Sequence, residues 1–227
     1  MNTKLTLDTP VKFLRSDLSA PWRKVTWKVG DWMPPIQGEL VPCQNGYHYT
    51  TIRYWNLHYA NRMFLITPAE ETIECDTKQV CRTAILTAEV TNWNQKNLSL
   101  FAADCAERVA HVCADPRVMA AIMAAIVAVR DYWAGKIGRE ELNVAAAAVD
   151  DVARVGCARA ADAADAAAYA VDVAYGANPA AAREAAAAYA ADAAADAAAD
   201  TLRLSTAYAA EREWQANRLL QYLNGEV

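Results

Sequence analysis

The chain has 227 residues and a formal net charge of −5, with 22 lysines and arginines against 27 aspartates and glutamates. This length suffices for one large or two small domains, and the negative balance argues against a general nucleic-acid-binding protein, which needs a basic face for phosphates. The sequence has neither a long apolar run nor a charged start followed by an apolar core, so we expect no membrane segment, no signal peptide and a cytoplasmic location.

The N-terminal part, residues 1–97, has the pattern of a small β-rich domain. Between Lys4 and Val90 short runs rich in β-branched and aromatic residues are separated by Pro, Gly and Asn-Gly signals. The runs are VKFLR, KVTWKVG, ELVPC, GYHYTTI, RMFLITPAEETIEC and RTAILTAEV. The segment TIRYWNLHYANR, which contains Tyr54 and Trp55, is predicted to be a short helix packed over the sheet.

Residues 98–227 are predicted to be helical. LSLFAADCAERVAHV is amphipathic, and Asp115 followed by Pro116 is typical of a capped helix start. Beyond Gly138 alanine dominates, and two long helices are expected, Arg139–Tyr175 and 179–223, joined by the turn GANPAA. Gly156 either interrupts the first of them or is tolerated within it. The second would be roughly 65 Å long at 1.5 Å per residue. The predicted fold class is therefore α+β, a β-rich domain followed by an alanine-rich antiparallel hairpin at about 139–223.

The alanine-rich helices also suggest self-association. Each alanine buries little apolar area, so a hairpin of this composition gains from a second copy, and a homo-oligomer, most simply a dimer, is expected. Trp214, Arg218 and Tyr222 fall at i, i+4 and i+8, on one helix face with apolar bulk. They are the candidates for an oligomer or partner contact.

The cysteines and tryptophans give weaker indications. The six cysteines form no CxxC pair, so we expect reduced, mostly buried thiols, with no metal site and no cofactor. Trp22, Trp27 and Trp32 are spaced by five residues, which fits neither one strand face nor one helix stripe. At least one of the three is therefore expected outside the main core.

The stretch CQNGYHYTT, residues 43–51, is the strongest candidate for a binding site. Asn45-Gly46 signals a turn, after which Tyr47, Tyr49 and Thr51 would face one side of a strand and His48 and Thr50 the other. A histidine and a hydroxyl beside aromatic side chains are suited to a small polar pocket with aromatic walls. The candidate ligand or partner contacts are Tyr47, His48, Thr50, Tyr54, Trp55 and Glu89. The competing interpretation is that Tyr47 and His48 only pack and bond within the sheet.

Several stretches of the chain together resemble a family. CQNGYH, the aromatic-rich segment, MFLITPAEETIECDTKQVCRTAILTAEV, LSLFAADCAERVAHV and the alanine repeats closing on EWQANRLLQYL occur in that order. This order resembles uncharacterised proteins of actinobacterial phages and prophages, with a G-[FY]-H element followed by A-A-x-D-A-A helices. The resemblance implies a phage or prophage accessory protein that acts in the bacterial cytoplasm.

Two functional hypotheses follow. GYHYTT is also similar to the entry strand of some ADP-ribosyltransferase-like folds, in which a downstream glutamate aligns the substrate. The available acids are Glu71, Glu74 and Glu89, of which Glu89 lies on the predicted strand ILTAEV. The flanking pattern of that glutamate motif is missing, as are a nucleotide-binding glycine loop and a nucleophile elbow. The favoured hypothesis is therefore a non-enzymatic interaction module that binds a host or phage protein or a small nucleotide-like ligand. The alternative is a small ADP-ribosyltransferase-like enzyme.

Overall fold

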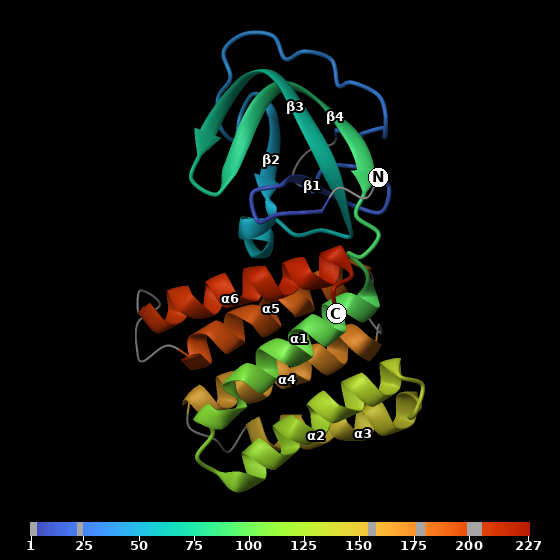
Figure 1. Cartoon of the computed structure of the whole chain (residues 1–227), viewed down its shortest axis with the longest axis vertical. Coiled ribbons are helices and arrows are strands. Elements are labelled where there is room, and N and C mark those ends of the chain that lie inside the picture. The colour runs from blue at the N-terminus through green and yellow to red at the C-terminus, as the bar shows by residue number, and fades with distance from the viewer. Residues whose placement is uncertain (1–3, 22–24, 154–157, 176–179, 199–205) are drawn as a thin grey trace. The chain divides into compact units, whose positions relative to one another are not determined.

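The computed structural model describes residues 4–21, 25–153, 158–175, 180–198 and 206–227 (Figure 1). The chain forms two compact units. The barrel unit comprises Met1–Trp93 and Leu220–Val227, and the helical unit comprises Asn94–Leu219. The fold class is α+β, as predicted. The first unit ends four residues before the predicted boundary at residue 97 and includes the C-terminal segment, which was predicted to belong with the helices.

The barrel unit is built from four antiparallel strands. They are β1 (Pro10–Leu14), β2 (Tyr47–Thr51), β3 (Arg62–Cys75) and β4 (Lys78–Glu89), with the 3₁₀ turn η1 (Ile52–Leu57) after β2. The strand order is β1-β2-β4-β3, and pairing of β3 with β1 closes the barrel. The short helix predicted after GYHYTT is thus present, in 3₁₀ form.

The long hairpin of β3 and β4 makes this closure possible. Its ladder carries register shifts at Leu65/Ile66 and at Ala69/Thr72. Bulges of this kind bend a strand and increase its twist, which is visible in the curved course of both strands in Figure 1. As a result β1 pairs with the first residues of β3, 62–65. β2 pairs with residues 79–81 of β4, which lie at the other end of the β3–β4 hairpin, next to its turn.

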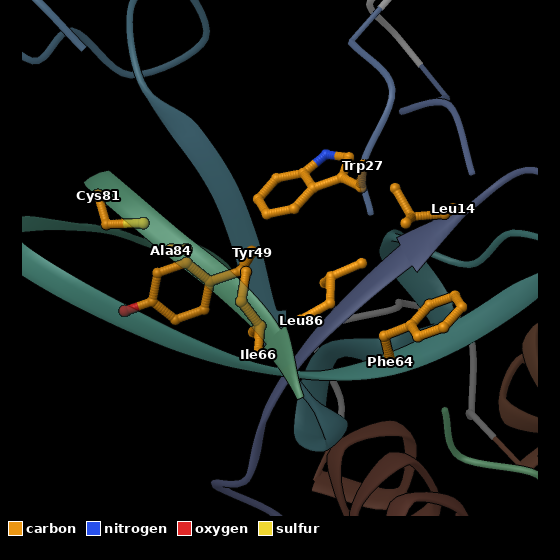
Figure 2. Close-up of a cluster of buried hydrophobic side chains, with 8 residues drawn as sticks. All are labelled: Leu14, Trp27, Tyr49, Phe64, Ile66, Cys81, Ala84 and Leu86. Carbon is orange, nitrogen blue, oxygen red and sulfur yellow. The ribbon is translucent and has the colours of Figure 1, made fainter. Parts of the chain in front are cut away.

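The barrel encloses a compact apolar core (Figure 2). Its members are Leu14, Trp27, Tyr49, Phe64, Ile66, Cys81, Ala84 and Leu86. The segment that carries Trp27 continues along β4, where Gly30 and Met33 donate backbone hydrogen bonds to Leu86 and Ala84. Trp27 is 2% exposed and Trp32 is 53% exposed. The prediction that at least one of the three tryptophans lies outside the main core is therefore confirmed. Trp22 lies outside the described residues.

The described helices are α1 (Gln95–Val109), η2 (Ala110–Val112), α2 (Pro116–Trp133), α3 (Arg139–Ala153), α4 (Ala158–Tyr175), α5 (Ala180–Ala198) and α6 (Thr206–Asn224). Asp115 caps α2 by accepting from the Arg117 backbone N–H, with Pro116 in the first turn, as predicted. In the helical unit α1 packs against α2, α4 and α5. None of the helices in the described part of the chain has the length and apolarity needed to cross a membrane.

The prediction of two long helices is wrong. α3 ends at Ala153 and packs against α4, so the chain reverses between them. α6 likewise lies against α5, because the Gln215 side-chain amide donates to the Ala191 carbonyl at 2.8 Å. Folding back lets an alanine helix bury more than one of its faces: in α4, Ala164 and Ala166 are both fully buried, although residues two apart point to different sides of a helix. A 65 Å rod would have left much of that surface in water.

A buried ionic network joins α1, α2 and α6 within the helical unit. Asp104, whose side chain is 9% exposed, accepts from Arg130 at 2.8 Å and from Arg218 at 2.8 Å. Glu211 is 4% exposed and accepts from Arg108 at 2.6 Å. Ion pairs therefore link both α2 and α6 to α1.

Candidate ligand-binding site

A cavity of about 530 Å³ opens in the barrel unit, a size typical of small-molecule sites. Side chains of β1, β2, the segment before Trp27 and the loop before β2 surround it. The lining residues are Val11, Lys12, Phe13, Ala20, Pro21, Val25, Trp27, Ile36, Cys43, Asn45, Gly46, Tyr47, His48, Tyr49, Thr50, Leu57, His58 and Lys78.

The cavity follows from the way β1 and β2 part. Their pairing is confined to Pro10 with Thr51 and Val11 with Thr50. One residue further along, the Lys12 ammonium donates a hydrogen bond to the backbone carbonyl of His48. A side chain therefore satisfies a carbonyl beyond the last paired residues of β1 and β2. The separation of the strands explains why residues from both faces of β2 line the same space.

The charge of the cavity is one-sided. Lys12, Lys78, His48 and His58 line it, and no aspartate or glutamate occurs among its described lining residues. Burial lowers the pKa of Lys12 to about 8. Burial also lowers the pKa of His58, and the nearby charges of Lys78 and Lys12 lower it further. The charges of Lys78 and Lys12 thus disfavour protonation of His58, in a site without a carboxylate among its described lining residues.

The walls of the cavity are aromatic and apolar. Trp27 and Tyr47 meet edge to face, with ring centroids 5.3 Å apart and planes at 69°. The Lys12 Nζ atom lies 5.5 Å from the Trp27 ring centroid, a cation–π distance. Burial raises the pKa values of Tyr47 and Tyr49, so both phenols stay neutral at physiological pH. A flat apolar group would find rings on which to pack here.

The loop of the CQNGYH motif forms the mouth. Asn45 donates its backbone N–H to the Val41 carbonyl, so the turn lies over residues 42–44, just before the Asn45-Gly46 pair where it was predicted. The Cys43 backbone N–H then donates to His48 Nε2 at 2.8 Å. Because Nε2 accepts, the neutral imidazole carries its proton on Nδ1. Lys78 Nζ lies 2.8 Å from Cys43 Sγ, so the loop, β2 and β4 meet at this point.

Of the predicted contacts, Tyr47, His48 and Thr50 line the cavity. Trp55 is 1% exposed and packs edge to face on Trp93 at 5.9 Å, and neither it nor the half-buried Tyr54 is a lining residue. Glu89 is bound by the Arg62 guanidinium through oxygens at 2.7 and 2.5 Å and does not line the cavity. The structure thus separates Glu89 from the site of His48.

The predicted contact face on α6 is largely engaged by the chain itself. Arg218 donates to Asp104, and Arg108 lies over the Trp214 ring at 4.5 Å from its centroid. Tyr222 is 5% exposed. Arg218 and Tyr222 are therefore engaged within the chain, whereas Trp214 is half-buried with Arg108 over its ring, so its role as a contact stays a prediction.

Sequence reasoning missed Lys12, Trp27, His58 and Lys78 as lining residues. Lys12 stands in an apolar strand, VKFLR, two positions before the core residue Leu14. The two-residue period of a strand places Lys12 on the same face as Leu14, a signal that was available. Lys78 and His58 carry no local signal, because the fold alone brings them to the loop of Cys43.

Comparison of the chain with known protein families, with curated proteins and with solved structures finds no match. In the described part of the chain, no group of three His, Cys, Asp or Glu side chains is placed to hold a metal ion.

Proposed function

We propose that this protein is a non-enzymatic binding module whose barrel cavity holds a small anionic ligand with an aromatic body. The observation that carries the proposal is the pair of lysines, Lys12 and Lys78, that lines the cavity together with His48 and His58, without a carboxylate among the described lining residues. Such a site stays electrostatically unfavourable until an anion enters it.

The lowered pKa values of Lys12 and His58 support this assignment. Each reflects a protonated form that is disfavoured by burial, and for His58 also by neighbouring positive charge. A bound anion would counter the neighbouring positive charge and would compensate for the loss of water around the protonated groups. The ring of the ligand would pack against Trp27 and Tyr47, and its charge would lie near Lys78 and His58. A nucleotide, the ligand class anticipated from the sequence, has both parts.

The biological setting is part of the same proposal. The ordered motifs from CQNGYH to EWQANRLLQYL support a phage or prophage accessory protein in the bacterial cytoplasm. The expected homo-oligomer stays a prediction, but its basis is weaker, since many of the alanines that motivated it are buried within the chain. An oligomer would have to use exposed side chains such as Val127 and Val144.

Calorimetric titration with matched probes tests the proposal. Benzoate and adenosine monophosphate are compared with the neutral benzyl alcohol and adenosine. We expect each anion to bind about ten-fold or more tightly than its neutral partner, a difference of about 1.4 kcal/mol, and to weaken as salt is added. Equal affinity within each pair, or no binding of any probe, would overturn the proposal.

A variant pair locates the binding. Lys78→Met should weaken benzoate binding several-fold because it removes one cation from the mouth. Lys136→Met is the matched control, since Lys136 is exposed and paired with Asp131 in the helical unit. An equal effect of the two substitutions would place the anion outside the cavity.

A further inference from the structure

Lys12 differs from the described lysines that form ion pairs. Lys4, Lys28 and Lys136 are exposed and paired with Glu226, Asp31 and Asp131. The Lys12 amine instead lies in the cavity, between the Trp27 ring and the backbone carbonyl of His48. An amine held against apolar walls without a carboxylate partner is the setting in which lysine acts as a nucleophile.

The protonation state of Lys12 supports this comparison. With a pKa of about 8, about a quarter of the side chain is the neutral amine at pH 7.5, against roughly one in a thousand at the ordinary value of 10.5. Of the titratable groups around it, the Cys81 thiol acts to raise this pKa, and the imidazole of His58 and the ammonium of Lys78 line the same cavity. Cys81 has a pKa of about 11 and stays neutral, so it does not hold the proton on Lys12.

We propose that the Lys12 amine captures the carbonyl carbon of an aromatic anion that carries an aldehyde, forming a reversible imine inside the cavity. This inference rests on the proposed function, because the mouth must first bind the anionic end. Lys78 and His58 would hold that charge while the ring packs against Trp27 and Tyr47, which leaves the aldehyde for the amine.

The chemistry balances without a further reactant. The Lys12 nitrogen forms a bond to the carbonyl carbon, and the carbonyl oxygen leaves as water with the two hydrogens of the amine. Nothing is oxidised or reduced. Because the cavity is open to water, hydrolysis returns the aldehyde and the free amine, so the capture is reversible.

The test uses 4-carboxybenzaldehyde with sodium cyanoborohydride, which reduces an imine to a stable secondary amine. Peptide mapping by mass spectrometry then compares the labelling rates of individual lysines at pH 7.5. We expect Lys12 to be labelled at least ten-fold faster than Lys28 or Lys136. We also expect uncharged benzaldehyde to label Lys12 more slowly. Equal labelling of the lysines, or preferential labelling of one other than Lys12, overturns the inference.

Controls separate this inference from the proposed function. Lys12→Arg keeps the charge and loses the amine, so it should lose the fast label at this position. Benzoate binding is measured by calorimetry on the wild-type chain, whose Lys12 is unchanged. Circular dichroism checks the fold of Lys12→Arg, and the mapping of the wild-type chain decides the question even if this variant is unstable. Benzoate binding without fast Lys12 labelling overturns the imine alone. Absence of both overturns the anion site as well.

Discussion

The ammonium of Lys12 donates a hydrogen bond to the backbone carbonyl of His48, beyond the two residue pairs that join β1 to β2. A backbone carbonyl left without a partner in a partly buried place is costly. The lysine thus fulfils two roles, since it completes the hydrogen bonding of the barrel wall and places a basic group in the cavity. Stability and binding should both respond to changes at this position.

Lys12 should make the stability of the chain depend on pH. The folded-state pKa of about 8 lies below the ordinary value of 10.5, so between these values the unfolded chain binds more protons and stability rises with pH. The full difference between the two pKa values corresponds to about 3 kcal/mol in the free energy of unfolding. Because water reaches an open cavity, we expect about 1–2 kcal/mol.

Urea denaturation of the wild type and of Lys12→Met at pH 7 and pH 9.5 measures this effect. The wild type should gain stability relative to the variant as the pH rises. The difference between the two proteins removes the contribution of other titrating groups. A difference that is constant between the two pH values would show that the Lys12 amine is not desolvated.

The fold could be predicted from the sequence in its elements but not in its helix pairing. Four of the six β-rich runs form strands, whereas ELVPC and the described part of KVTWKVG form only isolated bridges. Asp115 with Pro116 marks the start of α2, because local backbone chemistry decides where a helix begins. Between α3 and α4 the sequence offers one cue, Gly156, which left both an interrupted and a continuous helix open. The alanine-rich segment of α5 offers none. In AAAREAAAAYAADAAADAA nearly every face is alanine, so no apolar stripe indicates which side must be covered or where the chain turns back.

In the site, too, the residues near a local sequence signal could be predicted and those brought in by the fold could not. Tyr47 and His48 follow a turn signal and were predicted as contacts, and both line the cavity. Lys12 lies 36 residues from His48 in the sequence, and their contact depends on where β1 stops pairing with β2. Strand separation is a property of the whole barrel, including the bulges of β3 and β4. Local patterns therefore could not predict the basic cavity.

Gly46 should be intolerant of substitution. Its φ of +136° is disfavoured for residues with a side chain, and a Cβ atom there would overlap with Cγ1 of the buried Val80. We expect Gly46→Ala to lower the free energy of unfolding by about 3 kcal/mol or more. Gly30→Ala is the control, because Gly30 has a φ of +85° with no atom within 4 Å of the added carbon, and backbone strain alone should cost about 1 kcal/mol. Denaturation curves in which the two variants lose equal stability would contradict the predicted overlap.

Asp104 should contribute more to the helical unit than its neighbour Glu107, although both bind Arg130. The side chain of Asp104 is 9% exposed and also accepts from Arg218, whereas Glu107 is 42% exposed. Removing one partner of a buried pair leaves other charges uncompensated, so Asp104→Asn should cost about 2–3 kcal/mol. Glu107→Gln should cost less than about 1 kcal/mol. The measurement is chemical denaturation of both variants, and the reverse order of stability would show that Asp104 is solvated.

Cys43 should be the most reactive of the described cysteines. It is exposed at the mouth of the cavity, whereas Cys81, Cys105 and Cys113 are buried. Burial also raises the pKa of Cys81 to about 11 and that of Cys105 well above its usual value, which keeps these thiols protonated. Iodoacetamide at pH 8, followed by peptide mapping, should modify Cys43 first and Cys105 only after denaturation.

The same reaction reports on the cavity. A bound aromatic anion covers Cys43, so millimolar benzoate should slow its alkylation, while neutral benzyl alcohol should have a smaller effect. Cys75, which is half-buried and does not line the cavity, is the internal control and should react at an unchanged rate. If benzoate slows both cysteines equally, the protection is not local, and the ligand must act on the stability of the barrel unit instead of occupying the space beside Lys78.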